Sequence, residues 1–308
     1  MTQPYFSALL PELSIRAARA TVSRLGFSNA PLRAHLMDVF ARGFGERGAF
    51  LGSPVFEATF GWQTSNQTIA SLAGTLLDAE LIAAMDEPPG GKKSEYRFAK
   101  TASPYRHQIM AWEHLLAPEA QSVVVTSGTG SGKTECFMVP IINKLVVEHR
   151  QRKSKLVGVR ALFLYPLNAL IQSQRERLNA WTSRFDDGVR FCLYNGLTPN
   201  KVKQEQRDRS PNEVVDREVL RASPPPILVT NPTMLEYMLV RAQDAPIIDA
   251  SKGKLEWVVL DEAHTYIGSQ AAELALLLRR VLHAFGVKAE NVRFVARVSR
   301  ILCKRRLS

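Results

Sequence analysis

A short glycine-rich stretch restricts the fold of this 308-residue chain more than any other feature. Residues 122–134 read SVVVTSGTGSGKT, where a β-rich run leads into a glycine-rich turn and then into an apolar helical pattern. Glycine lets the backbone curl until successive N–H groups point at one anion, an approach that side chains would block. The order of strand, glycine-rich turn and helix therefore predicts a phosphate-binding loop in an α/β fold.

The positions of this loop have distinct expected roles. Lys133 is expected to neutralise the β and γ phosphates of a nucleotide, and the Thr134 hydroxyl is expected to ligate Mg²⁺ beside the positive end of a helix dipole. The common pattern G-x-x-x-x-G-K-[ST] begins with glycine, where this chain has Ser127. The candidate nucleotide-binding residues in the loop are Ser127, Gly128, Thr129, Gly130, Ser131, Gly132, Lys133 and Thr134.

A second motif, VVLDEAH at residues 258–264, ends an apolar run with two adjacent carboxylates. Such a pair is unfavourable at a strand end unless a cation or a proton-transfer task stabilises it. Asp261 is expected to hold Mg²⁺ at the phosphates, and Glu262 is expected to orient or deprotonate the attacking water. Together with Lys133 they form the predicted catalytic set, while His264 fits packing as well as chemistry.

Short β-rich runs alternate with helical patterns from the loop to residue 296. Parallel strands need long crossovers, which are usually helices, so the alternation predicts a parallel sheet covered by helices on both faces. Ligands of such sheets bind at the carboxyl ends of strands. The turns after residues 126, 165, 230 and 260 are therefore the expected site-forming turns.

The first hundred residues form a separate pattern. Helical periodicity in three stretches predicts a mainly helical accessory region, at residues 6–25, 30–44 and 68–85. Residues 49–63 are richer in aromatic residues and glycine, and fit either a short strand pair or a loop. No catalytic constellation stands out in this region, which favours an accessory or docking role.

A domain boundary is expected within EPPGGKKSE, residues 87–95, because this segment concentrates helix breakers and charge. The expected division is a helical accessory region at residues 1–100, a nucleotide-binding domain at residues 101–296 and a basic tail at residues 297–308.

The charge balance bears on the partner. Forty Lys and Arg against 29 Asp and Glu give a formal charge of +11 and a pI near 9.8, which favours a polyanionic partner, although a solvated basic surface has the same composition. Three scattered cysteines without a CxxC pair indicate neither a disulfide framework nor a zinc site and fit a reducing compartment. No apolar run approaches about 18 residues, so we expect no membrane span and a cytoplasmic location.

Several motifs occur in the order typical of one family. Gln108, with Tyr105 upstream, is similar to the Q motif that recognises adenine, and SGTGSGKT and DEAH match motifs I and II. YPLNALIQSQ at residues 165–174 and TNPTML at residues 230–235 resemble motifs Ia and Ib. Over residues 103–296 the chain resembles the first RecA-like domain of a superfamily 2 DExH-box helicase. The leucine-rich run after DEAH is similar to that of large Lhr-like or YprA-like helicases.

The resemblance implies a RecA-like α/β domain that uses ATP and Mg²⁺, with Gln108 at the adenine. It also implies a DNA or RNA partner, held as a single strand largely through its phosphates. Asn168, Thr230 and Thr233 have suitable chemistry for that contact. Motif Ia lacks the cation that many relatives carry, because Leu167 and Asn168 follow its proline.

The family pattern stops after NVRFVA at residues 291–296. Relatives continue with a Ser-Ala-Thr motif and a second RecA-like domain, whereas this sequence continues as RVSRILCKRRLS. Loss of an arginine finger typically slows phosphoryl transfer by about 10³ to 10⁵. We therefore expect a truncated or frame-disrupted product, or half of a split helicase whose second domain comes from another chain. A basic tail that binds phosphates in its own right fits the same residues.

The resulting expectation is the ATP- and nucleic-acid-binding half of a helicase, with weak turnover alone, so that the enzymatic status of the isolated chain stays open. One alternative is an inert nucleic-acid-binding or interaction fragment whose motifs are relics. Another is an unrelated P-loop enzyme such as a small-molecule kinase, which the ordered set of motifs disfavours.

Overall fold

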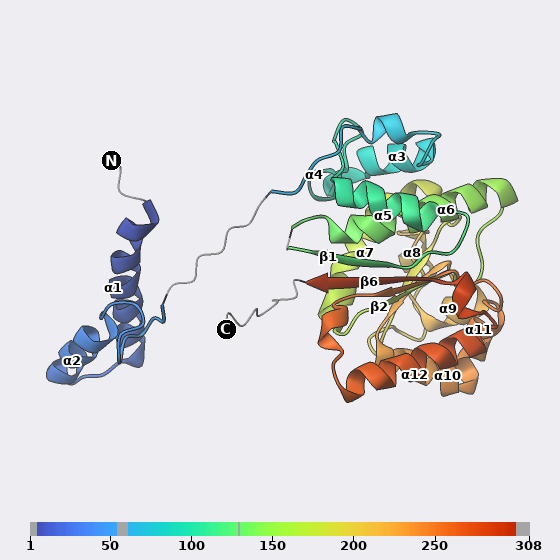
Figure 1. Cartoon of the computed structure of the whole chain (residues 1–308). Coiled ribbons are helices and arrows are strands. Elements are labelled where there is room, and N and C mark those ends of the chain that lie inside the picture. The colour runs from blue at the N-terminus through green and yellow to red at the C-terminus, as the bar shows by residue number, and fades with distance from the viewer. Residues whose placement is uncertain (1–4, 54–60, 129, 300–308) are drawn as a thin grey trace. The chain divides into compact units, whose positions relative to one another are not determined.

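The computed structural model describes residues 5–53, 61–128 and 130–299 (Figure 1). Thr129 of the predicted loop and residues 300–308 of the predicted tail lie outside the described residues. The chain divides into two compact units, Met1–Gly61 and Trp62–Ser308. In the described residues, no helix combines the length and the apolar character needed to cross a membrane.

The first unit is a helical pair, α1 (Tyr5–Leu25) and α2 (Ala30–Phe40). Asn29 caps α2, because its side chain accepts a hydrogen bond of 3.0 Å from the Leu32 N–H. The Ser14 hydroxyl of α1 donates to the Arg42 carbonyl just beyond α2 and so ties the pair together. The described part of residues 49–63 contains neither a helix nor a strand, so there it forms a loop.

The second unit is built on one parallel sheet in the order β1-β6-β5-β2-β4-β3. Its strands are β1 (Val123–Ser127), β2 (Ala161–Leu164), β3 (Phe191–Tyr194), β4 (Ile227–Thr230), β5 (Trp257–Leu260) and β6 (Arg293–Ser299). The predicted parallel sheet is confirmed. The last strand is longer than predicted, because residues 297–299 continue the ladder with β1 and are not a tail.

Helices cover both faces of this sheet, as predicted, with α5 and α6 on one side and α10 and α12 on the other (Figure 1). The helices of the unit are α3 (Ala79–Asp86), α4 (Lys93–Tyr96), α5 (Arg106–Leu116), α6 (Lys133–Arg152), α7 (Asn168–Thr182), α8 (Gln204–Asp208), α9 (Arg217–Ala222), α10 (Pro232–Val240), α11 (Ala245–Asp249) and α12 (Ser269–Ala284). Alternate residues of β2 serve the two cores: Phe163 packs in the core of α5, α6 and α7, and Leu162 in the core of α10 and α12.

Residues 62–100 belong to the second unit, so the structural boundary lies earlier than the expected one at residues 87–95. The reason is burial, since Ile69, Leu77 and other apolar side chains of this segment complete the core of α5, α6 and α7. The Asn143 side chain of α6 also accepts a hydrogen bond of 2.7 Å from the Asp78 N–H. The breaker-rich stretch folds onto the domain, partly as α4, instead of forming an interdomain linker.

One ion pair within this segment makes stability depend on pH. Asp86, at the end of α3, is buried and accepts hydrogen bonds from Arg97 Nη2 at 2.8 Å and Nε at 3.0 Å. These bonds from Arg97 lower the pKa of the carboxyl below its ordinary value. A carboxyl whose folded pKa is lowered stabilises the fold above its unfolded pKa, and the stabilisation is lost as the pH falls through the folded pKa.

We therefore expect Asp86→Asn to lower the free energy of unfolding at pH 7, and the difference from the unchanged protein to shrink as the pH falls below about 4. Urea unfolding at pH 7, 5 and 3.5 measures it. A difference that stays constant over this range would contradict the ion-pair origin.

Candidate nucleotide and nucleic-acid site

Two predicted motifs meet at one edge of the sheet. The glycine-rich loop follows β1 and the DEAH turn follows β5, and both strands are neighbours of β6. Parallel strands end at the same edge, so the loop and the two carboxylates lie on either side of the carboxyl end of β6. The sheet thus brings Lys133, Thr134, Asp261 and Glu262 to one place.

The loop between β1 and α6 has the backbone that the glycines predict. Gly130 and Gly132 have φ values of 78° and 71°, in the left-handed region that favours glycine. A Cβ atom on Gly132 would lie 2.3 Å from the side-chain nitrogen of Gln108, so another residue is excluded there. Ser127 replaces the usual first glycine without strain, because it ends β1 and its hydroxyl contacts the Ser131 hydroxyl at 2.5 Å.

Lys133 is the first residue of α6 and is buried at the mouth of the loop. Its Nζ donates to the Ser127 carbonyl at 2.8 Å and to the Gly128 carbonyl at 2.9 Å. Burial lowers the pKa of Lys133, and the nearby positive charge of Arg297 lowers it further, while Glu262 and Asp261 oppose the shift. The ammonium group is therefore held over the loop by groups that a phosphate can replace.

Gln108 links the segment before α5 to this loop. Its side-chain oxygen accepts from the Tyr105 N–H at 2.8 Å, and its side-chain nitrogen donates to the Gly132 carbonyl at 3.1 Å. Both ends of the amide are thus engaged within the protein, which gives Gln108 a positioning role in the described form. Trp112, one turn further along α5, adds a bond from its indole N–H to the Glu135 carbonyl at 2.9 Å.

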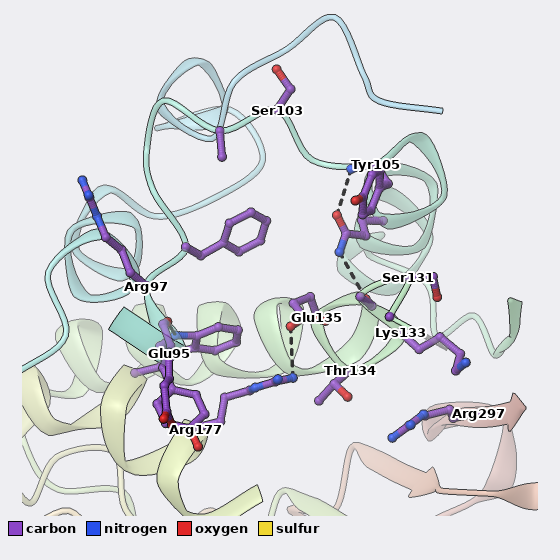
Figure 2. Close-up of a pocket in the computed structure, with 17 residues that line it drawn as sticks. Glu95, Arg97, Ser103, Tyr105, Ser131, Lys133, Thr134, Glu135, Arg177 and Arg297 are labelled. Atoms are coloured by element: carbon purple, nitrogen blue, oxygen red, sulfur yellow. Dashed lines mark hydrogen bonds and ion pairs between the residues drawn. The ribbon is translucent and has the colours of Figure 1, made fainter. Parts of the chain in front are cut away.

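A cavity of about 520 Å³ opens beside the loop (Figure 2). Lys133, Thr134 and Arg297 lie together at one end of it. Arg177 of α7 also lines the cavity, and it forms an ion pair with Glu135 at 3.0 Å (Figure 2).

The sequence did not predict two parts of this cavity. Tyr96 and Phe98, which directly follow the segment expected to be a linker, line it together with Trp181 of α7. The Trp181 indole N–H donates to the Tyr96 carbonyl at 2.8 Å and fixes this wall. Tyr96 and Phe98 could have indicated that this part of the chain packs against the domain, because linkers are usually poor in large apolar side chains.

The two carboxylates of the DEAH turn differ in their surroundings. Asp261 is only 1% exposed, and burial raises its pKa above the ordinary value. Glu262 has a φ of 47°, an uncommon left-handed conformation for a residue other than glycine. His264 lies beside it, with Nδ1 3.3 Å from Glu262 Oε2. This backbone turn directs the two acidic side chains differently at the end of β5.

Arg297 of β6 is a further residue of the site, and the sequence pattern did not indicate it. Its Nη1 lies 3.0 Å from Asp261 Oδ1 and donates to Oδ2 at 3.3 Å, and its Nη2 lies 3.6 Å from Glu262 Oε1. The guanidinium therefore neutralises both Asp261, the predicted metal ligand, and Glu262, the predicted base.

The donor set fits Mg²⁺ bound together with a nucleotide. Asp261 Oδ1 is buried, and it faces Arg297 Nη1 at 3.0 Å without accepting a hydrogen bond from it. Thr134 supplies a hydroxyl at the wall of the cavity. Mg²⁺ prefers such oxygen ligands, and commonly takes one or two from the protein and the rest from phosphates and water. Within residues 5–53, 61–128 and 130–299, no group of three His, Cys, Asp or Glu side chains could hold a metal by itself.

The predicted nucleic-acid residues divide into two groups. Asn168 and Thr233 are exposed and line a groove of about 730 Å³. Thr230 is fully buried, and its hydroxyl donates to the Tyr194 carbonyl at 2.6 Å, so the expected surface contact by Thr230 is wrong. Its side chain packs inside the sheet because β4 continues to this residue.

Asn231, which the sequence analysis did not single out, is a polar residue of the same groove. Its side chain donates to Asn168 Oδ1 at 2.9 Å and accepts from the Met234 N–H at 2.8 Å, where it caps α10. The start of α7 and the start of α10 thus meet at the groove.

Comparison with known proteins gives a consistent result. The model of the DEAD/DEAH box helicase family matches residues 105–296. The Druantia protein DruE of Escherichia coli is 28% identical over an alignment that covers 62% of this chain and 16% of that protein. The uncharacterized ATP-dependent helicase YprA of Bacillus subtilis is 26% identical, with 59% of this chain and 21% of that protein covered.

Solved structures are similar in fold. The DUF1998 helicase MrfA, bound to DNA and AMPPNP, matches 79% of this chain and 28% of its own with a TM-score of 0.53 and 22% identity. The DEAD-box helicase Mss116, bound to single-stranded RNA and UDP-BeF, matches 78% of this chain and 42% of its own with a TM-score of 0.54 and 16% identity. The chain spans less than a quarter of the length of DruE and YprA.

Proposed function

Because the chain belongs to the DEAD/DEAH box helicase family, we propose that its second unit binds ATP with Mg²⁺ in the cavity beside β1 and holds a nucleic-acid strand along the groove at α7 and α10. One observation carries the nucleotide part. The sheet places a glycine loop with a buried lysine and a pair of adjacent carboxylates on either side of one strand end. This is the arrangement that phosphoryl transfer from a nucleotide requires.

Each side chain has a task in this proposal. Lys133 exchanges its two carbonyl partners for the β and γ phosphates, and Thr134 and Asp261 hold the metal ion. When bound, Mg²⁺ neutralises the charge that develops on the phosphate oxygens. Glu262 orients the attacking water and accepts its proton, and His264 beside it restrains the carboxylate.

The proposed nucleic-acid contact uses backbone N–H groups and short polar side chains. Thr233 and Asn168 stand at the N-terminal ends of α10 and α7, where free N–H groups and the helix dipole favour a phosphate. Of the two proteins of similar fold, MrfA is bound to DNA and Mss116 to single-stranded RNA. We propose a single strand as the partner, and ATP-dependent remodelling as the activity of an assembly in which a second RecA-like domain contacts the bound ATP.

Calorimetric titration with a nonhydrolysable ATP analogue and Mg²⁺ tests the nucleotide site. We expect saturable binding of one analogue molecule per chain. If the analogue releases or absorbs no binding heat and ADP does not compete with it, the chain would instead be a fragment that binds nucleic acid without nucleotide.

The groove residues predict a measurable loss of strand binding. Asn168→Ala and Thr233→Ala are each expected to weaken binding of a fluorescent single-stranded oligonucleotide about 2- to 10-fold, since each removes one hydrogen-bonding group. Fluorescence anisotropy with DNA and with RNA oligonucleotides measures both affinities. Thr75→Ala, an exposed threonine of the same unit outside the groove, is the control and should change neither. Unchanged affinity in both groove variants would reject the groove as the binding surface.

A further inference from the structure

Arg297 occupies a place that no proposed step of nucleotide hydrolysis uses. It lies on β6, opposite Val125 of β1, on the strand that separates the loop from the DEAH turn. Its side chain is 20% exposed, whereas that of Asp261 is 1% exposed, so the contact between them is largely shielded from water. Ion pairs in such surroundings are screened much less than surface pairs.

We propose that Arg297 is an internal counterion that occupies the metal position at Asp261 and Glu262, and that it must leave before Mg²⁺ can bind with the nucleotide. This inference rests on the proposed nucleotide site. Arg297 then has a positioning role, because its ion pair with Asp261 determines how strongly nucleotide affinity depends on Mg²⁺.

The distances place Arg297 and a metal ion in competition for the same carboxylate of Asp261. Both oxygens of Asp261 face the same guanidinium nitrogen, at 3.0 and 3.3 Å. Mg²⁺ demands oxygen ligands at about 2.0 to 2.1 Å in near-octahedral order, and a guanidinium on the same oxygens would obstruct and repel it. Metal binding is therefore expected to weaken or displace the Arg297 ion pair.

A displaced Arg297 side chain can turn toward the phosphates of the bound nucleotide. The side chain lines the cavity together with Lys133 and Thr134, where the nucleotide phosphates are proposed to lie. Guanidinium pairs readily with phosphate oxygens. In the absence of metal the same arginine would bind phosphate directly, so the protein should retain part of its nucleotide affinity without Mg²⁺.

The experiment compares nucleotide affinity with Mg²⁺ and with EDTA. Calorimetry with the nonhydrolysable ATP analogue gives the ratio of the two dissociation constants for the unchanged chain, Arg297→Met and Arg297→Gln. We expect the stabilisation by Mg²⁺ to be about tenfold larger in both variants, because the competing charge-assisted pair is gone. Circular dichroism checks that the variants are folded.

A matched control is available in the same cavity. Arg177→Met removes an equal charge from α7, where the partner is Glu135 and not a proposed metal ligand. It should weaken binding by a similar factor with and without Mg²⁺ and leave the ratio within about twofold.

The outcomes are distinguishable. If the unchanged chain and both Arg297 variants bind nucleotide with the same ratio of dissociation constants in EDTA and in Mg²⁺, the counterion role is overturned. The proposed nucleotide site would then still stand. A ratio raised equally by Arg177→Met would also overturn it, since the effect would then follow total charge. No nucleotide binding by the unchanged chain or by any variant would reject the proposed site and this inference together.

Discussion

Replacing Lys133 by alanine is expected to weaken binding of a nonhydrolysable ATP analogue by about 100-fold or more. The buried ammonium is placed to exchange the Ser127 and Gly128 carbonyls for phosphate oxygens, and charge-assisted hydrogen bonds of this kind are among the strongest in proteins. Loss of two of them, at about 1.5 to 3 kcal/mol each, accounts for a factor of this size. Calorimetric titration measures the change.

Lys144→Ala is the matched control for that experiment. Lys144 lies on the same helix and pairs with Glu256, away from the cavity-lining residues. It should leave the affinity within about twofold, because partly exposed ion pairs contribute little. Binding by Lys133→Ala that remains close to that of the control would show that the loop does not hold the phosphates.

The second large effect concerns stability. Trp112→Ala is expected to lower the free energy of unfolding by about 3 to 5 kcal/mol, the usual range for removing a large buried aromatic side chain. Trp112 is fully buried in the core, where its ring meets Phe98 edge-on, and the change also removes its bond to the Glu135 carbonyl. Urea unfolding followed by far-UV circular dichroism measures the loss.

Trp62→Ala serves as its control. Trp62 is 37% exposed, so its removal should lower the free energy of unfolding by less than about half of the Trp112 loss. The Trp112 variant should also bind nucleotide more weakly at temperatures where it is still folded, because Glu135 belongs to the first turn of α6. A Trp112 loss no larger than that of Trp62 would contradict the packing described here.

The sequence predicted most of what local pattern controls. The alternation of strands and helices indicates a parallel sheet, and the rule that ligands bind at the carboxyl ends of strands places Lys133, Thr134, Asp261 and Glu262 at one edge. The glycine positions were informative because Gly130 and Gly132 need left-handed backbone. These features depend on neighbours in the chain and are therefore visible in it.

The rest depends on contacts between distant residues. Strand order is such a property, because the residues of β6 do not indicate that it lies between β1 and β5. The sequence therefore predicts a tail from Arg297 onward. The sequence predicts a surface contact for Thr230, but a hydroxyl at a strand end can face either a groove or a neighbouring strand. The pairing of β4 with β3 directs the Thr230 hydroxyl to the Tyr194 carbonyl. The packing of residues 62–100 on α6 and α7 was hidden for the same reason.

The position of β6 also has a consequence for how the molecule comes together during synthesis. Among the described strands, β1 lies at the edge of the sheet and pairs with β6 alone, and β6 follows the other five strands in sequence. While residues 293–299 are still inside the ribosome, β1 has no neighbouring strand to pair with, although most of the domain has already emerged. Such long-range pairing is slow and leaves strand edges exposed. The edge of β1 should therefore stay open to pairing with other chains until β6 inserts.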